Sequence, residues 1–271
     1  NCILRKIKMK SPKISVVTVS YNTRDCIEKT ILSVIGQTYP NVEYLIIDGG
    51  SIDGTQEVVE RYSDRIVYFV SERDKGLYDG MNKGIAAATG DYLLFMNADD
   101  VFADNEVAGK IAHFIEEHPD ADVVYGNSEQ ILEYGTYEVK PKVAYLNHKM
   151  AISHQATFVK LSLLRSHPFD LKYRYAADFE QLSSLYLAGH TFKYIDCLVA
   201  RVEMTGGTTY NNYIRSVNEL YDIIESRGVD VRRERRLMIL RKRIVRALKC
   251  ALPQCIANPL FRFLAKHYKV L

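Results

Sequence analysis

The chain has 271 residues, of which 47% are hydrophobic and 25% charged, so it suits one large globular domain, or one domain with a small appendage. Its five cysteines are odd in number and form no CxxC pair, so we expect no disulfide framework and a reducing compartment. No apolar run approaches the roughly 18 residues that span a bilayer, and no apolar stretch of signal-peptide length follows the basic segment 1–10, so we expect a protein that does not cross a membrane by itself.

The first half of the chain alternates between strand patterns and helix patterns. Ile14–Ser20 is β-branched and almost continuously apolar, which is typical of a buried parallel strand. A helix is expected over Asn22–Thr38, with Asn22 or Thr23 able to cap it. Further strands are predicted at Val42–Ile47, Ile66–Val70, Tyr92–Met96 and Ala121–Tyr125, and further helices at Gly54–Tyr62, Leu77–Ala88 and Asn105–Glu117. The alternation predicts right-handed βαβ units, hence an α/β fold with a mainly parallel sheet flanked by helices.

After Gly126 the pattern changes. Glu129–Lys140 is typical of a hairpin that turns near Tyr134–Gly135, so we expect an antiparallel element to join the sheet. A helix is predicted at Asp178–Ala188, and from Tyr210 the chain is almost wholly helical in pattern. We therefore divide the chain into a domain at 11–209 and a helical extension at 210–271.

Polar side chains follow each of the first four predicted strands. In open α/β sheets, ligands bind beyond the carboxyl ends of the strands. Turns carry such residues for local reasons too, but four clusters on one rim favour a polar ligand site. The clusters are Ser20-Tyr21-Asn22, Asp48-Gly49-Gly50-Ser51, Glu72-Arg73-Asp74-Lys75 and Asn97-Ala98-Asp99-Asp100.

The fourth cluster places carboxylates directly after an apolar strand. Mg²⁺ and Mn²⁺ prefer oxygen ligands and commonly bridge substrate phosphates. We therefore predict Mn²⁺ or Mg²⁺ at Asp99. The alternative is that Asp99 or Asp100 caps the next helix.

Two nucleotide signatures are absent from the sequence. No GxGxxG follows the first strand and no GxxxxGK[ST] occurs, which disfavours dinucleotide-binding and P-loop enzymes. The first strand runs instead into Ser20-Tyr21-Asn22, a segment that can stack on a base and hydrogen-bond to it.

Six segments, in order and with matching spacing, resemble family 2 glycosyltransferases of the inverting, GT-A-fold type. They are ISVVTVSYN, IIDGGSIDGT, DKGLYDGMNKGI, GDYLLFMNADD, SHQATFVK and AADFEQ, and they fall between residues 13 and 195. The resemblance implies a GT-A (Rossmann-like) fold, a metal-dependent nucleoside-diphosphate-sugar donor and an inverting mechanism.

The resemblance also implies roles for individual residues. Asp48 matches the base-binding aspartate, and Val19 and Tyr21 would line the base pocket. Asp99 matches the final Asp of the DxD metal motif, and Asp178 matches the acceptor-side carboxylate that serves as general base. The departures from the family pattern are Asn97 for the first Asp of DxD, Gly49 for a common second Asp after Asp48, and Ala177 for the Glu before Asp178. Asn97, with Ala98 beside it, can still bind the nucleotide by a hydrogen bond to the ribose.

For several candidate residues a structural role is the alternative to the functional one. Lys75 would meet phosphate or lie on solvated surface, as would Arg73. Asp178 opens an apolar helix, so a capping role competes with the base role, and Glu180 is the second candidate base. His154 would contact the diphosphate or the acceptor; the alternative is that its side chain has only a structural role.

The C-terminal segment is strongly basic. Residues 229–271 hold 12 Lys or Arg against 2 Asp or Glu, interleaved with leucine, isoleucine and valine. Basic amphipathic helices lie on anionic membrane surfaces, which we favour. Packing on the main domain and, last, nucleic-acid binding are the alternatives.

We therefore expect a metal-dependent, inverting, hexosyltransferase-type enzyme. It would move a sugar from a nucleoside diphosphate to a saccharide on a polyprenyl-diphosphate lipid. UDP is the favoured nucleotide, because Asp48 can accept a hydrogen bond from N3–H of uracil, and GDP is the alternative. The product would be a repeat unit of a cell-surface polysaccharide. The enzyme would act at the cytoplasmic face of the cell membrane, and we expect no nucleic-acid partner. The rival hypotheses are a metal-dependent nucleotidyltransferase and a catalytically inactive membrane-binding scaffold, the latter suggested by Asn97 and Ala177.

Overall fold

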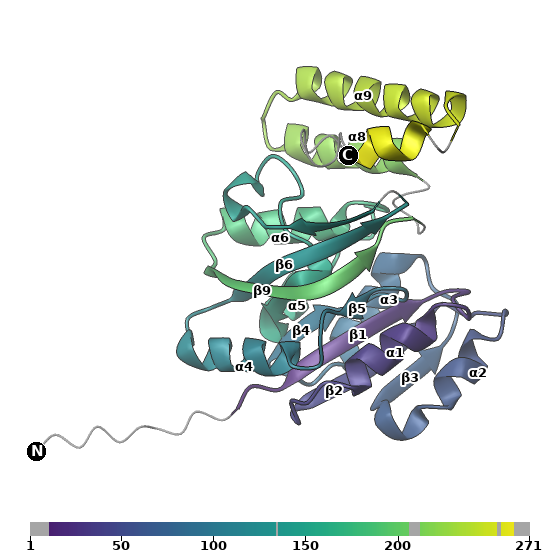
Figure 1. Ribbon diagram of the computed structural model, residues 1–271. Coiled ribbons are helices and arrows are strands. Elements are labelled where there is room, and N and C mark those ends of the chain that lie inside the picture. Colours follow the sequence, from purple (N-terminus) through teal and green to yellow (C-terminus); the bar gives the residue numbers. More distant parts are fainter. Residues whose placement is uncertain (1–10, 134, 206–211, 254–255, 263–271) are drawn as a thin grey trace, which may run out of the picture.

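The computed structural model describes residues 11–133, 135–205, 212–253 and 256–262. Its strands are β1 (Ile14–Ser20), β2 (Val42–Asp48), β3 (Tyr68–Ser71), β4 (Tyr92–Phe95), β5 (Val101–Phe102), β6 (Val123–Leu132), β7 (Gly135–Val139), β8 (Thr157–Lys160) and β9 (Phe192–Glu203). Its α-helices are α1 (Ile27–Ile35), α2 (Thr55–Glu60), α3 (Leu77–Ala87), α4 (Val107–Glu117), α5 (Leu161–Ser166), α6 (Ala177–Leu187), α8 (Tyr213–Ser226) and α9 (Arg232–Ala251). The expected α/β class is confirmed (Figure 1).

One curled sheet runs through the molecule in the order β3-β2-β1-β4-β8-β6-β9-β5, with β7 paired to β6. The first four strands are parallel, as the βαβ pattern predicts. The register sets Ser20 of β1 and Ser71 of β3 beside Asp48 of β2. The carboxyl ends of these strands, where polar clusters were predicted, therefore lie at one rim.

The second half of the sheet differs from the sequence prediction. The expected fifth strand and the first arm of the hairpin are one strand, β6, and β7 completes the hairpin, although Tyr134 of its turn lies outside the described residues. β8 was not predicted and inserts antiparallel between β4 and β6, so the sheet is mixed there. β9 was also missed, although its sequence is rich in aromatic and β-branched residues, and it pairs parallel with β6.

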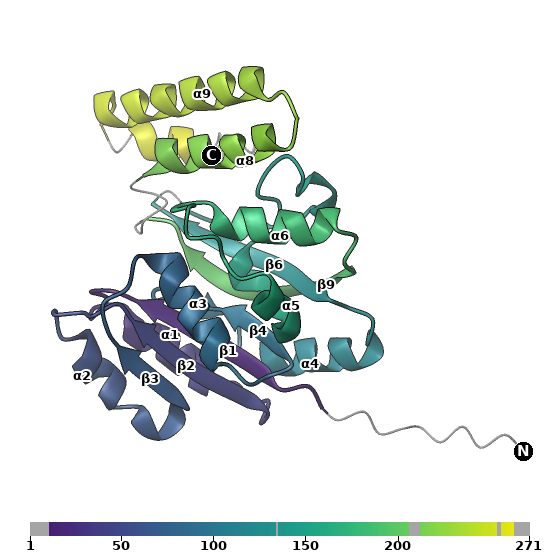
Figure 2. The same ribbon diagram turned by 180° about the vertical axis from the view of Figure 1, so that it is seen from behind.

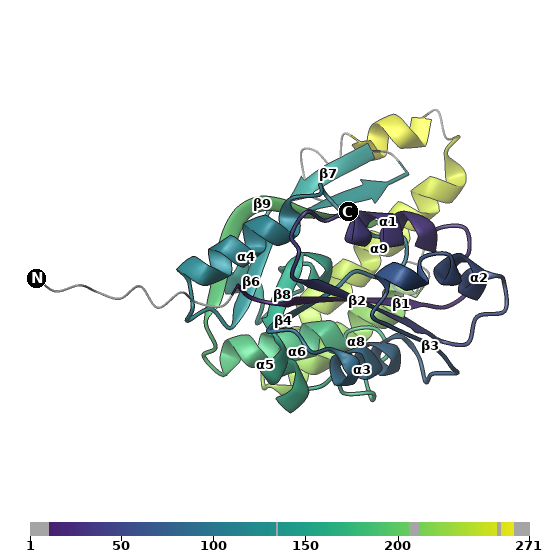
Figure 3. The same cartoon turned by 90° about the horizontal axis from the view of Figure 1, so that it is seen from below.

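Two apolar cores cover the two faces of the sheet. In Figure 3, α1, α2 and α4 lie on one face, and α3, α5 and α6 lie on the other. Phe158 is buried in the first core, and Phe179 of α6 in the second. Helix α3 approaches β1 closely because Gly84 has no side chain; a Cβ there would lie 2.5 Å from Cγ1 of Val17.

The helical pattern predicted after Tyr210 is confirmed as α8 and α9 over the described residues. Helix α8 buries Val217, Tyr221 and Ile224 in the same core as α6, and α9 lies along α8 on the side away from the sheet (Figures 1 and 2). The division at residue 210 remains a prediction, although α8 shares the core of the larger domain. Within the described residues, no helix is both long and apolar enough to cross a bilayer.

Candidate active site

The Asp48 side chain joins the carboxyl ends of β1, β2 and β3 through hydrogen bonds. Its side chain is fully buried, and Oδ1 accepts hydrogen bonds from the hydroxyls of Ser20 at 2.9 Å and Ser51 at 2.6 Å. Its Oδ2 accepts from the Ser71 hydroxyl at 2.6 Å and from the backbone N–H groups of Gly50 at 3.1 Å and Ser51 at 2.8 Å. A carboxylate offers about four lone-pair sites, so these donors use its capacity. The base-binding role of Asp48 stays a prediction, and it would require one of these bonds to break.

Another carboxylate lies beside the predicted base pocket. Tyr21, at the end of β1, exposes 62% of its surface. A Cβ built on Gly49 would lie 2.7 Å from Oδ2 of Asp74 and 3.3 Å from the Tyr21 ring, and one built on Gly80 would meet the same oxygen at 3.4 Å and Val19 at 2.7 Å. Asp74 therefore fills the space left by the missing side chain at position 49. Its Oδ1 accepts from the Gly76 N–H at 2.9 Å, which leaves Oδ2 facing Val19 and Tyr21.

The segment after β4 holds its two aspartates differently. Asp99 has a φ of 89°, a strained value for a residue with a side chain, and its N–H donates to Oγ1 of Thr30 at 3.0 Å. Its carboxylate is one-third exposed and pairs with the Lys29 ammonium. Asp100 is buried, accepting from Gln155 Nε2 at 2.9 Å and from the Glu203 N–H at 3.1 Å, and burial raises its pKa to about 6. Asp99 is thus the more accessible carboxylate.

The residues of this segment fit a hard cation with few protein ligands. The side-chain oxygen of Asn97 is buried and has no hydrogen-bond partner in the described structure, although such atoms are normally paired. An amide oxygen and a carboxylate on one short segment suit Mg²⁺ or Mn²⁺, which keep waters and substrate phosphates as their other ligands. Among the described residues, no group of three or more His, Cys, Asp or Glu side chains gathers for a metal. A cation here would therefore depend on Asp99 and Asn97.

A chain of hydrogen bonds joins Asp178 to Asn97. The Tyr78 hydroxyl donates to Oδ1 of Asp178 at 2.9 Å, and Nδ1 of His154 lies 3.0 Å from its Oδ2. Nε2 of His154 lies 3.1 Å from Nδ2 of Asn97. If Nδ1 carries the imidazole proton, every donor has an acceptor: His154 donates to Asp178, and Asn97 donates to His154. One imidazole thus connects Asp178, the predicted acceptor-side carboxylate, with the segment that carries Asp99.

Asp178 is arranged to remain ionised. Burial would raise its pKa, but the hydrogen bonds from His154, Tyr78 and the Phe179 N–H outweigh burial and lower it. Burial and the Asp178 charge raise the pKa of Tyr78, which stays a neutral donor. Asp178 is not the helix cap: α6 starts at Ala177, and its N-cap is Ala176. The capping alternative is therefore wrong, whereas the base role stays a prediction.

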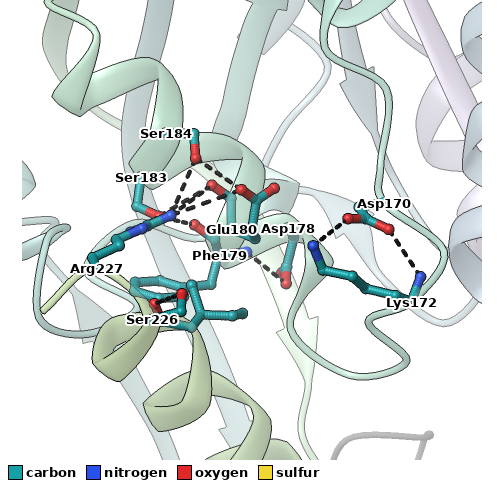
Figure 4. Close-up of polar contacts among 10 residues, drawn as sticks. Asp170, Lys172, Asp178, Phe179, Glu180, Ser183, Ser184, Ser226 and Arg227 are labelled. Carbon is teal, nitrogen blue, oxygen red and sulfur yellow. Dashed lines mark hydrogen bonds and ion pairs between the residues drawn. The ribbon is translucent and has the colours of Figure 1, made fainter.

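The remaining candidates lie around this centre. Lys75 and Arg73 are exposed between β3 and α3, and neither side chain makes an ion pair within the described part of the chain, so both remain available to a phosphate. Glu180 lies on the side of α6 that meets α8, where its Oε1 accepts from Ser184 at 2.8 Å and lies 3.9 Å from Arg227 (Figure 4). Glu180 is thus engaged with α8 and makes no hydrogen bond to His154 or Asp178.

Two residues of the site, Tyr78 and Asp74, were given no role from the sequence. Tyr78 lies 100 positions from Asp178 in the chain, and α3 also carries the polar residues Asp79, Asn82 and Lys83, so no local pattern distinguished its hydroxyl. Asp74 belongs to a rim cluster that was recognised, and the glycines at 49 and 80 were the signal that space had been left for it.

Comparisons with known sequences match this chain to glycosyltransferases. The glycosyl transferase family 2 profile matches residues 15–167. A PGL/p-HBAD biosynthesis glycosyltransferase of Mycobacterium tuberculosis is 31% identical over 180 residues, covering 64% of this chain and 69% of that protein. An uncharacterized glycosyltransferase of the same species is 30% identical over 203 residues, covering 72% of this chain and 77% of that protein.

Two solved structures with nucleotide sugars bound share this fold. S. aureus TarS 1–349 in complex with UDP-GlcNAc has a TM-score of 0.64 at 19% identity, covering 88% of this chain and 73% of that one. The longer TarS chain is matched over 43% of its length. The Pyrobaculum calidifontis mannosyltransferase PcManGT, in complex with GDP-Man and Mn²⁺, has a TM-score of 0.66 at 17% identity, covering 97% of this chain and 83% of that one. With the family profile spanning more than half of its residues, the chain belongs to glycosyl transferase family 2.

Proposed function

We propose that this glycosyltransferase inverts the anomeric centre as it moves a sugar from a nucleoside diphosphate to a saccharide hydroxyl. The observation that carries the proposal is the Asp178–His154–Asn97 connection, which sets an ionised carboxylate one imidazole away from the predicted donor rim. An inverting displacement needs a base on the acceptor side and charge stabilisation on the leaving-group side. The arrangement supplies groups suited to both.

The donor nucleotide would lie across the carboxyl ends of β1 to β4. Tyr21 stacks on the base over Val19, while Asp48 holds the strand ends together beneath. Oδ2 of Asp74 accepts an N–H of the base, the role that the sequence assigned to Asp48. Asn97 and Ala98 meet the ribose, and Lys75 meets the diphosphate. Both UDP and GDP suit this acceptor, because uracil and guanine each present an N–H, and we favour UDP. TarS binds UDP-GlcNAc and PcManGT binds GDP-Man.

A divalent cation, Mn²⁺ or Mg²⁺, would be held by Asp99 with Asn97, and it would offset the charge that gathers on the departing diphosphate. The unpaired Asn97 oxygen and the Mn²⁺ in PcManGT support this assignment. Lys29, which pairs with Asp99, would have to move aside or turn toward the phosphates.

Asp178 would accept the proton of the attacking hydroxyl. Its lowered pKa keeps it ionised at neutral pH, the form that can take a proton. Tyr78 and the Phe179 N–H occupy Oδ1 and His154 occupies one site on Oδ2, which leaves a lone pair on Oδ2 for the acceptor. The side chain is 13% exposed, so a hydroxyl can reach it while bulk water is largely excluded.

The acceptor would be a saccharide on a polyprenyl-diphosphate lipid, made into cell-surface polysaccharide. Support comes from α9, whose outer side exposes Leu237, Leu240 and Ile244 at helical spacing, each more than half exposed. Arg233, Arg236 and Arg243 are exposed on the same helix. This pattern of apolar residues among guanidinium groups suits the anionic cytoplasmic face of a membrane.

Two experiments test the proposal. Asp178→Asn should abolish sugar transfer, measured as nucleoside-diphosphate release from UDP- and GDP-sugars, while leaving nucleotide binding intact; retained transfer would contradict the base assignment. In flotation with phosphatidylglycerol vesicles, wild type should float, and Leu240→Asp combined with Arg236→Glu should not. Equal flotation of the two proteins, or equal flotation with phosphatidylcholine, would contradict the membrane assignment.

A further inference from the structure

Glu219 of α8 reaches into the segment that leads into α6. Its Oε1 accepts from the backbone N–H of Arg174 at 2.7 Å, and its Oε2 accepts from those of Tyr175 at 2.5 Å and Ala176 at 2.7 Å. Three successive N–H groups that converge on one carboxylate form an anion-binding concavity. The segment 174–176 is therefore fixed by a side chain from another helix, 43 residues or more away in the chain.

The start of α6 has no local substitute for this contact. Its N-cap is Ala176, whose side chain cannot accept a hydrogen bond from the first turn. The Ala176 N–H, paired with Glu219, lies two residues before Asp178. The path of the backbone into Asp178 is consequently set by Glu219.

A second contact fastens α8 to the body of α6 (Figure 4). Nη1 of Arg227 donates to the Ser183 hydroxyl at 2.8 Å, and Nη2 donates to the Ser184 hydroxyl at 3.1 Å. The guanidinium carbon also lies 5.8 Å from the centre of the Phe179 ring. Because α8 is attached both before the first turn of α6 and along it, Glu219 acts from a fixed support.

We propose that Glu219 is a positioning residue for Asp178, so that α8 belongs to the catalytic machinery. The inference rests on the proposed function, in which Asp178 is the base. A general base works only within hydrogen-bond reach of the proton that it takes, and a displacement of about 1 Å can cost about 100-fold in rate. By binding the backbone of 174–176, Glu219 keeps the Asp178 carboxylate hydrogen-bonded to Tyr78 and His154 and within reach of the acceptor hydroxyl.

The test is Glu219→Gln, which keeps the size of the side chain but turns an NH₂ group toward backbone donors. The matched control is Asp222→Asn, a change to an exposed carboxylate of the same helix that pairs with Arg235 of α9. The readout is hydrolysis of UDP-GlcNAc or GDP-mannose, whichever the wild type turns over, with water in place of the acceptor. We expect kcat to fall about 10- to 100-fold in Glu219→Gln, with the Kd of the nucleotide unchanged within about twofold, and no such loss in the control.

Amide hydrogen exchange separates positioning from a general loss of stability. Glu219→Gln should raise exchange at 174–178 while leaving β1 to β4 protected, whereas a purely structural role would lower thermal stability and leave kcat of the folded protein unchanged. If Glu219→Gln does not fold, Glu219→Asp, which keeps the charge but withdraws it by one methylene, should show the same loss of kcat.

Comparing the Glu219 and Asp178 variants separates a failure of the positioning role from a failure of the proposed base. Wild-type kcat in a folded Glu219 variant, together with an inactive Asp178→Asn, overturns the positioning role alone. An active Asp178→Asn overturns the proposed base, and the positioning role falls with it.

Discussion

Asp74→Asn is predicted to weaken nucleotide binding sharply without disturbing the fold. The amide oxygen of the new side chain can keep the hydrogen bond from the Gly76 N–H. Its NH₂ group then replaces Oδ2, the oxygen that faces Tyr21 and the space above Gly49. An N–H of the base would there meet a donor in place of a charged acceptor.

The magnitude follows from the loss of one charge-assisted hydrogen bond. Such bonds contribute about 1.5–3 kcal/mol, so the Kd of the preferred nucleotide should rise about 10- to 150-fold. Calorimetric titration measures this directly. Asp79→Asn is the control, because Asp79 lies nearby in the first turn of α3, where its carboxylate accepts a hydrogen bond from the Lys75 N–H at 3.0 Å.

A charge swap sharpens the experiment. The Cβ of a residue at position 49 would start 2.7 Å from the Asp74 oxygen, and Gly49 has no left-handed φ that would penalise a side chain. Combining Gly49→Asp with Asp74→Gly should therefore return a carboxylate to the pocket and recover part of the affinity. Nucleotide binding by Asp74→Asn within twofold of wild type would show that Asp74 does not bind the base.

Three further predictions concern stability and metal binding. Burial would raise the pKa of Glu43, but four hydrogen bonds from Lys13, Ser15 and Thr89 outweigh burial and lower the pKa from 4.5 to about 2. The stabilisation from this carboxylate is therefore present above pH 4.5 and is lost as the pH falls toward 2. Glu43→Gln should cost about 2 kcal/mol at pH 7 in urea unfolding and should flatten the acid loss; an unchanged pH profile would contradict this. Lys29→Gln should tighten Mn²⁺ binding about 2- to 5-fold by freeing Asp99, measured by electron paramagnetic resonance, and weaker binding would show that Lys29 assists the metal. Phe158→Ala should cost about 3–5 kcal/mol in thermal unfolding, against under about 0.5 kcal/mol for the exposed Val67→Ala, and similar costs would contradict the core assignment.

The sequence predicts the first half of the fold well because its signals are local. Ile14–Ser20 and the strands that follow are apolar runs separated by helices, and the right-handed βαβ rule then brings Ser20, Asp48 and Asn97 to one rim. The start of α1 was less accurate: Asn22 does not cap it, and α1 begins at Ile27. The N–H of Asn22 is instead bound by the Ser51 hydroxyl at 2.7 Å, across 29 residues.

The contacts that organise the site are long-range, and this limits prediction. The order of the sheet beyond β4 depends on β8 and β9, whose pairings join distant segments. The Tyr78–Asp178 and Glu219–Ala176 contacts likewise span 100 and 43 residues. Sequence comparison marked Asp178 but could not reveal the side chains that hold it, because those partners have no fixed spacing from it.

The donor site is tested most directly by calorimetric titration of UDP and GDP, each with and without Mn²⁺, into wild type and Asp99→Ala. We expect one nucleotide to bind in a Mn²⁺-dependent manner and the substitution to remove this dependence. Absence of binding of both nucleotides by protein that circular dichroism shows to be folded would contradict the donor site, and with it the proposed transfer reaction.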